Sequence, residues 1–314
     1  MASRPISSKY DFVKVRVWLG DHYYTFSRFL VSRVLTVTKV SYQDSLKISL
    51  TLKKELVDRE LLDVTQSEME ALLFAVMKKH GYQEEYTRRY RLMTRFHHRR
   101  VPLIVMLSGT GCVGKSSIAT QLAERLNLSA VLQTDVVFQV MRQGESRESE
   151  KCLFRKHESD AAFVAQYEKE CQLVREGLQG ELSKVLSEGK AIIIEGSHLD
   201  PSLYHALREH GQDGGKEGAK LIFAMFTLTA TDTEHEVFLD NHWLPDTWAE
   251  YPSLGSSRGG VREEFKLNLS RLNRHLCAKS EELNVPVINV SVHTFGRSLD
   301  MLHTTVMEMM EEEV

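Results

Sequence analysis

The chain has 314 residues, of which 42% are hydrophobic and 26% charged, and its formal net charge is −3. This length exceeds what one small core needs and predicts two domains of ordinary globular composition. A near-neutral chain gives no general reason to expect DNA, RNA or an anionic membrane as a partner. No stretch approaches the roughly 20 apolar residues of a membrane helix, and the polar first residues lack the apolar core of a secretory signal.

The cysteines are few and far apart. They are Cys112, Cys152, Cys171 and Cys277, with no close pair among them. This spacing argues against a disulfide framework and against a zinc site. We therefore expect a protein of the reducing cytoplasm. The sequence does not indicate its oligomeric state.

Residues 8–95 are predicted to form a short β-hairpin followed by a helical bundle. Val13, Val15 and Val17 alternate with polar residues, which indicates a half-buried strand before the turn at 20–21. Apolar residues then recur at helical spacing in three further segments. They are Phe26, Leu30, Val34 and Val37, then Leu46, Leu50, Leu52 and Leu56, then Met69, Leu72, Leu73, Val76 and Met77.

A strongly basic segment, Tyr86–Arg100, precedes the next strand, so we place the domain boundary near residue 100. Two interpretations stay open for this segment. It can be a solvated connecting helix, or it can be an arm that contacts an anion near the active site.

From residue 101 to 314, apolar runs alternate with helical segments. This alternation is the signature of a parallel α/β sheet whose strands are buried on both faces. The loops are expected at three places: a mobile loop at 143–159, a surface loop at 212–218, and a Pro- and Gly-rich loop or lid at 241–260. The terminal glutamates 311–313 are expected to form a solvated tail.

The segment 109–116 has the pattern G-x-x-x-x-G-K-[ST] between a predicted strand and a predicted helix, which is the context a phosphate-binding loop needs. Its glycines let backbone N–H groups turn toward a phosphate, and the helix N-terminus adds a partial positive charge. Lys115 is expected to reach the β- and γ-phosphates of ATP, and Ser116 to hold Mg²⁺. The predicted nucleotide-binding residues are Gly109, Thr110, Gly111, Cys112, Val113, Gly114, Lys115, Ser116 and Ser117.

Two further candidates follow the second strand of this region. Asp135 is predicted to end that strand, where a carboxylate can orient an acceptor hydroxyl and take its proton. An aspartate here can equally be a helix N-cap, and both roles can coexist. Arg142 lies two turns further on, as a clamp for an anionic group of the substrate or as a surface arginine.

Glu195 ends the apolar strand 191–194 and is predicted to organise Mg²⁺ in the manner of a Walker B carboxylate. His198 follows in the next turn and is a candidate for substrate contact or a structural histidine. A kinase also closes basic side chains over the phosphates. The candidates for that role are Arg258 and Arg262, with Arg155 or Lys156 as alternatives.

Three segments, 109–128, 131–142 and 189–204, resemble the 2-phosphoglycerate kinase family of archaea and its eukaryotic relatives, including plant P-loop proteins linked to low phytic acid. The resemblance implies a fold similar to nucleoside monophosphate kinases, with a five-stranded parallel sheet. It also implies that residues 8–95 form an ATP-cone-like regulatory domain, in which Tyr24–Arg28 matches a characteristic segment.

Within this resemblance, Asp135, Arg142, Glu195 and His198 match family positions. The sequence departs from the archaeal pattern at Phe238–Pro245, where the archaeal proteins are basic.

The sequence therefore predicts an ATP- and Mg²⁺-dependent kinase that acts on a small, anionic phosphorylated metabolite. The first acceptor to consider is 2-phosphoglycerate, giving 2,3-bisphosphoglycerate, and an inositol phosphate is a close competitor. A second hypothesis is a regulator that binds ATP without phosphorylating a metabolite. A third, a nucleic-acid-dependent ATPase, rests only on the basic segment near residue 95.

Overall fold

The computed structural model describes residue 10 and residues 12–128, 131–142, 151–212, 221–242 and 258–313. The chain divides into two compact units, Met1–His98 and Arg99–Val314. Each unit has its own sheet and its own hydrophobic core. No helix among the described residues is both long enough and apolar enough to cross a bilayer.

The N-terminal unit combines a small sheet with helices. Strands β1 (Arg16–Leu19) and β2 (His22–Thr25) form an antiparallel hairpin, and β3 (Asp63–Thr65) pairs parallel to β1. The helices are α1 (Arg28–Val37), α2 (Tyr42–Asp58), α3 (Gln66–Lys79) and α4 (Glu84–Arg99). The hairpin and the helices agree with the prediction. Strand β3 was not predicted, because three residues are too few to show an alternating pattern.

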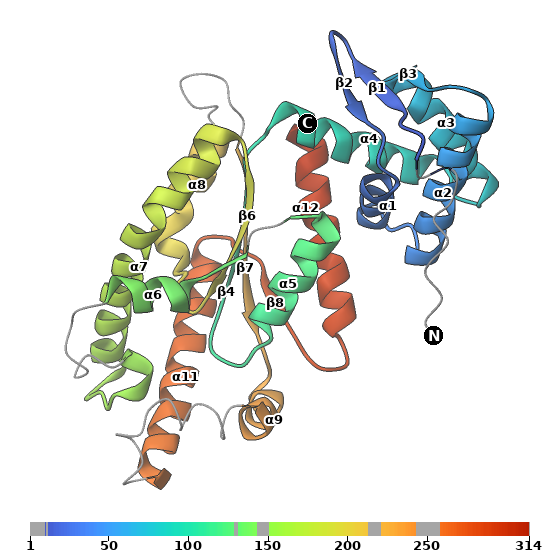
Figure 1. Ribbon diagram of the computed structural model, residues 1–314. Helices are drawn as coiled ribbons and strands as arrows, with labels where there is room; N and C mark the ends of the chain where they lie inside the picture. The colour runs from blue at the N-terminus through green and yellow to red at the C-terminus, as the bar shows by residue number, and fades with distance from the viewer. Residues whose placement is uncertain are drawn as a thin grey trace, which may run out of the picture. The chain divides into compact units, whose positions relative to one another are not determined.

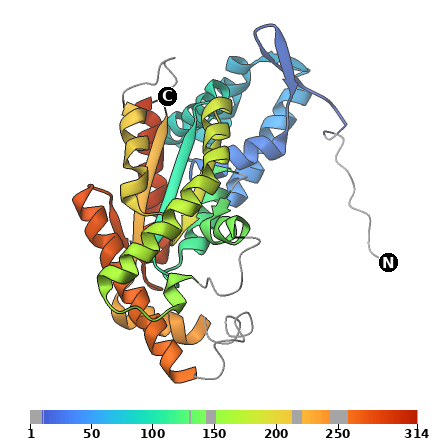
Figure 2. The same cartoon turned by 90° about the vertical axis from the view of Figure 1, so that its left-hand side faces the viewer.

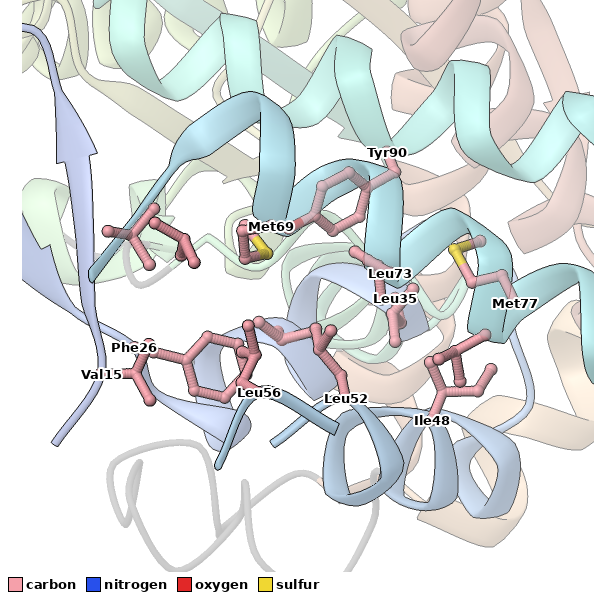
Figure 3. Close-up of a cluster of buried hydrophobic side chains, with 14 of the residues drawn as sticks. Val15, Phe26, Leu35, Ile48, Leu52, Leu56, Met69, Leu73, Met77 and Tyr90 are labelled. Carbon is pink, nitrogen blue, oxygen red and sulfur yellow. The ribbon is translucent and has the colours of Figure 1, made fainter. Parts of the chain in front are cut away.

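The core of this unit corrects the predicted helix faces at two positions. Leu30 and Leu50, which the spacing places on apolar faces, are 56% and 46% exposed. Leu35 in α1 and Ile48 in α2 are fully buried instead. Figure 3 shows these two side chains in the same cluster as Tyr90, which comes from α4. The partner elements therefore select a buried stripe that lies beside the one favoured by spacing alone.

The C-terminal unit is built on five parallel strands in the order β5-β6-β4-β7-β8. The strands are β4 (Leu103–Gly109), β5 (Val131–Gln133), β6 (Ala191–Gly196), β7 (Ile222–Thr229) and β8 (Val287–Asn289). The predicted α/β fold with a five-stranded parallel sheet is confirmed. Strand β4 lies at the centre and is buried along its whole length, as its uninterrupted apolar run predicts.

Helices cover both faces of this sheet, as Figures 1 and 2 show. Helices α5 and α12 pack on one face, and α6, α7, α8 and α11 lie on the other. The helices are α5 (Lys115–Leu126), α6 (Thr134–Met141), α7 (Asp160–Glu188), α8 (Pro201–Gln212), α9 (Asp232–His242), α11 (Arg258–Glu282) and α12 (Phe295–Glu313). The predicted apolar stripes of α7 and α11 are buried, with Tyr167 and Leu269 each 1% exposed.

The predicted loops and tail need three corrections. Residues 151–159 of the predicted mobile loop contain a 3₁₀ turn, Cys152–Phe154, whose Cys152 is buried. This segment is fixed because the Asn268 side chain of α11 donates hydrogen bonds to the Leu153 and Arg155 carbonyls. The terminal glutamates are not a separate tail, since they form the last turn of α12. The ends of the other two predicted loops are helical, since residue 212 belongs to α8, residues 241–242 to α9 and residues 258–260 to α11. Residues 143–150, 213–218 and 243–257 of the predicted loops lie outside the described residues.

The strand register brings the ends of β4, β5 and β6 to one edge of the sheet. Ser108 of β4 pairs with Gly196 of β6, and Gln133 of β5 pairs with Glu195 of β6. The carboxyl ends of parallel strands are where open α/β sheets bind ligands. The fold therefore places the loop after β4, the start of α6 and the turn after β6 beside one another.

Gly196 is the position at which this edge tolerates no side chain. Its backbone has φ of +152°, and a Cβ would lie 1.7 Å from Thr134 Oγ1. We expect Gly196→Ala to cost at least about 1–3 kcal/mol of stability through backbone strain, before any clash is counted. The measurement is the urea midpoint of unfolding.

The matched control is Gly180→Ala, because Gly180 lies inside α7 and its Cβ would meet nothing within 4 Å. That change is expected to stabilise the helix by about 0.5–1 kcal/mol. An unchanged midpoint for Gly196→Ala would show that the close approach of β6 to α6 is not a constraint.

Candidate active site

The phosphate loop joins β4 to α5 through left-handed backbone at three positions. Gly109, Cys112 and Gly114 have φ values of +146°, +56° and +82°. A Cβ on Gly109 would lie 2.4 Å from the Leu228 carbonyl oxygen of β7. Consecutive N–H groups in such a loop, together with the N-terminus of α5, form a site that suits a phosphate anion. The geometry is therefore what the sequence pattern predicts for this segment.

Lys115 is buried at the first turn of α5, and its Nζ donates a 2.5 Å hydrogen bond to the Thr110 carbonyl across the loop. Burial lowers the pKa of this ammonium group, while the charges of Glu195 and Asp135 oppose the shift. A phosphate in the loop would add the counter-charge that burial calls for. Lys115 therefore lies across the loop whose bound phosphate it is expected to contact.

Ser116 and Glu195 meet across the edge of the sheet. The Ser116 hydroxyl donates a 2.8 Å hydrogen bond to Glu195 Oε1, and Glu195 is 4% exposed. Hydroxyl and carboxylate oxygens are hard ligands of the kind Mg²⁺ prefers. The two residues predicted to hold Mg²⁺ thus lie together and fit that ion chemically.

Asp135 lies in the first turn of α6, which corrects the prediction that it ends strand β5. Helix α6 begins at Thr134 and its N-cap residue is Gln133, so Asp135 is not the N-cap either. The helix therefore includes two residues, Thr134 and Asp135, that the prediction placed in the strand. A carboxylate in this first turn is still favoured by the helix dipole.

One oxygen of Asp135 is held by basic groups. Its Oδ1 lies 2.9 Å from Lys151 Nζ and 3.5 Å from His198 Nδ1. The Asp135 side chain is 53% exposed, so desolvation disfavours its ionised form only in part, and Lys151 and His198 together keep the pKa of Asp135 below its ordinary value. Since both contacts are made by Oδ1, Oδ2 is the oxygen that can face an acceptor hydroxyl.

Three basic side chains pack against the aromatic ring of Phe138, next to Asp135. His198 stacks on this ring with centroids 4.9 Å apart and an interplanar angle of 16°. The Arg142 guanidinium carbon lies 5.0 Å from the ring centroid, and Lys151 Nζ lies 6.0 Å from it. The structure therefore brings Asp135, Arg142 and His198 together, with Lys151 added to them.

Side chains from β4, α7 and α11 hold the turn that carries His198. Tyr167 donates a 2.8 Å hydrogen bond to the Ser197 carbonyl, and Ser108 donates a 2.7 Å bond to the Leu199 carbonyl. Asp200 pairs with His275 at 2.7 Å, a contact that together with its bonds from Ser202 keeps the pKa of Asp200 low despite burial. His198 is thus fixed by packing and by its neighbours.

The predicted lid residues are placed only in part. Arg258 and Arg262 lie in the first turns of α11, and their side chains fall outside the described part of the structure. Arg155 and Lys156 follow the 3₁₀ turn, where the Arg155 carbonyl accepts the bond from Asn268 of α11.

Two residues of the site were missed. Lys151 lies in a stretch without periodicity, so no sequence signal marks it. Glu170 lies on the apolar stripe of α7, three residues after Tyr167 and four before Val174, and is buried. A carboxylate on a stripe that is otherwise apolar is a signal that could have found it.

Comparison with known proteins adds relatives but no family profile. No model of a known protein family matches this chain. A protein named 2-phosphoglycerate kinase from Methanococcus maripaludis is 23% identical over 95% of this chain and 96% of its own length. The protein of the same name from Methanocaldococcus jannaschii is 26% identical over 92% of this chain and 91% of its own length.

A third relative, 2-phosphoglycerate kinase from Pyrococcus horikoshii, is 31% identical over 56% of this chain and 62% of its own length, so this match spans less than two thirds of that protein. The resemblance to archaeal 2-phosphoglycerate kinases is therefore confirmed. Because these relatives are kinases by name and the chain has a phosphate loop on a parallel sheet, the predicted enzyme class, a P-loop phosphotransferase, is confirmed as well.

Lys151 provides a direct test of the electrostatics at Asp135. A neighbouring cation favours the ionised carboxylate, so Lys151→Met should raise the pKa of Asp135 toward its ordinary value. The low pKa of Asp135 in the folded protein stabilises the fold above the ordinary carboxyl pKa, and this contribution is lost as the pH falls through the pKa of the folded state. The contribution should be smaller in Lys151→Met. The measurement is a ¹³C NMR titration of the Asp135 carboxyl carbon.

Lys156→Met is the matched control, since Lys156 is exposed in the same segment and should leave the titration unchanged. An identical titration in wild type and Lys151→Met would contradict the assigned role of Lys151.

Proposed function

We propose that this protein transfers the γ-phosphoryl group of ATP to a hydroxyl group of 2-phosphoglycerate, giving 2,3-bisphosphoglycerate. The observation that carries the proposal is the common sheet edge where the phosphate loop, Glu195 and Asp135 meet. The choice of acceptor is supported by the names of the archaeal relatives that match over more than 90% of their length. An inositol phosphate, suggested by the plant resemblance, is the competing acceptor that the experiment below includes.

In this proposal the loop residues 109–117 bind the nucleotide phosphates, and Lys115 stabilises the charge that develops on the transferred group. Ser116 and Glu195 would hold Mg²⁺, which when bound neutralises phosphate charge. Burial of Lys115 and Glu195 strengthens these electrostatic effects, because the surroundings have a low effective dielectric constant.

The acceptor side is formed by the cluster around Phe138. The oxygen of the acceptor hydroxyl forms a bond to the γ-phosphorus while the bond from that phosphorus to ADP breaks. Asp135 Oδ2 takes the proton that this hydroxyl loses. Arg142 and Lys151 supply the positive charge that a phosphorylated acceptor requires. His198 contacts Asp135 at Oδ1, the oxygen that does not face the acceptor. Arg258 and Arg262 remain predicted to close over the phosphates.

Two expectations stay predictions from the sequence. The first is that residues 8–95 act as an ATP-cone-like regulatory domain. The second is a cytoplasmic location.

The proposal is tested by supplying ATP and Mg²⁺ with 2-phosphoglycerate, 3-phosphoglycerate or inositol monophosphates in separate reactions. ADP release and the phosphorylated product, identified by mass spectrometry, are followed in each. We expect 2-phosphoglycerate to give one bisphosphorylated product per ADP. Product from an inositol phosphate alone would move the proposal to that acceptor. Nucleotide binding without any stimulated turnover would favour the ATP-binding regulator instead.

Asp135→Asn should separate binding from transfer. An asparagine cannot take the acceptor proton, so kcat is expected to fall by about 10²–10⁴-fold while the Kd for ATP stays within a few-fold of wild type. Asp58→Asn, on an exposed aspartate at the end of α2, is the control and should leave both values unchanged. Full activity in Asp135→Asn would rule out Asp135 as the base.

A further inference from the structure

Glu170 is a buried carboxylate with one oxygen that no hydrogen bond satisfies. It lies in the middle of α7 and is 5% exposed. Its Oε1 accepts a 2.8 Å hydrogen bond from the Cys152 backbone N–H. Its Oε2 is buried and has no hydrogen-bond partner among the described residues. Burying half of a carboxylate in this way is costly unless a nearby group compensates the charge.

The group that faces this oxygen is the imidazole of His198. Its Nε2 lies 3.8 Å from Glu170 Oε2, a distance at which the attraction is electrostatic. Its Nδ1 points the other way, 3.5 Å from Asp135 Oδ1 and 3.3 Å from Thr134 Oγ1. The ring therefore lies between two carboxylates, one deep in the fold and one at the site.

The other titratable groups around this row of three do not supply Glu170 with a counter-charge. Lys151 and Lys115 act on Asp135, at the far end of the row. On the near side lie the thiols of Cys152 and Cys171. Burial raises the pKa of both, and the charge of Glu170 and a hydrogen bond with it further raise that of Cys152, so both thiols stay neutral. Among the described residues, the imidazole is thus the cation-forming group in contact with Glu170.

We propose that Glu170 is a positioning residue that acts on Asp135 through His198. Its Oε2 attracts a proton on His198 Nε2 and so holds the ring with Nδ1 toward Asp135. With a proton on Nδ1 as well, the ring is an imidazolium that shares Asp135 Oδ1 with Lys151 and leaves Oδ2 to the acceptor hydroxyl. This inference rests on the proposed function for its kinetic consequence, but the protonation of Nε2 is independent of any acceptor.

The alternative is that Glu170 only accepts hydrogen bonds from Cys152, from its backbone N–H and from its thiol. Glu170→Gln distinguishes the two roles, because the amide oxygen can keep the backbone bond while the NH₂ group replaces Oε2. An NH₂ group facing His198 donates to Nε2, so the imidazole must then carry its proton on Nδ1. A purely structural role predicts no change in the protonation of the ring.

The experiment is ¹⁵N NMR of the histidine side chains at neutral pH, with the His198 signals assigned by their loss in His198→Asn. We expect a protonated Nε2 in wild type and an unprotonated Nε2 in Glu170→Gln. With the acceptor found above, kcat of Glu170→Gln should fall by about 10- to 100-fold, as for other orienting partners of a functional histidine. The KM for ATP should stay unchanged.

Glu168→Gln is the matched control, since Glu168 is exposed on the same helix two residues away. Glu170→Asp keeps the charge and should retain more activity than Glu170→Gln. An unprotonated Nε2 in wild type would overturn the proposal, even if Glu170→Gln does not fold or no acceptor is found. An unchanged kcat in a folded Glu170→Gln would overturn it too, whereas inactivity of the wild type itself would count only against the proposed function.

Discussion

The parallel pairing of β4 with β6 is the constraint on which the site depends. Ser108 pairs with Gly196, so the loop that leaves β4 and the turn that leaves β6 begin at the same height of the sheet. Because β5 pairs with the other side of β6, the start of α6 is brought to that height as well. Gly196 permits the close approach, since its missing side chain leaves room for Thr134. A one-residue shift of β4 against β6 would separate Ser116 from Glu195. The same shift of β5 against β6 would separate Asp135 from His198.

Charge is arranged across this edge in two linked groups. At the phosphate loop, burial depresses the pKa of Lys115, and the charge of the buried Glu195 opposes that shift. At the start of α6, Asp135 lies beside Lys151 and His198, and His198 in turn lies beside the buried Glu170. The two groups share Asp135, whose charge also acts on Lys115. Binding at one group therefore changes the electrostatic field at the other.

Sequence alone predicts the parts of this protein that local pattern determines. The phosphate loop, the uninterrupted apolar run of β4 and the buried stripe of α7 all follow from spacing and residue type. It fails where distant partners decide. Leu30 is exposed because the rest of the N-terminal unit buries Leu35 instead, and Lys151 reaches Asp135 only through the fixed segment before α7. Asp135 was assigned to the wrong element by two residues, yet its place at the sheet edge follows from either assignment.

The central claim is that this edge joins a phosphate donor to an acceptor hydroxyl. The most direct measurement is ³¹P NMR of the full-length protein with ATP, Mg²⁺ and 2-phosphoglycerate. The account predicts that the γ-phosphate signal is replaced by a new phosphomonoester signal, in step with the appearance of ADP. Replacement by inorganic phosphate, with the 2-phosphoglycerate signal unchanged, would contradict it.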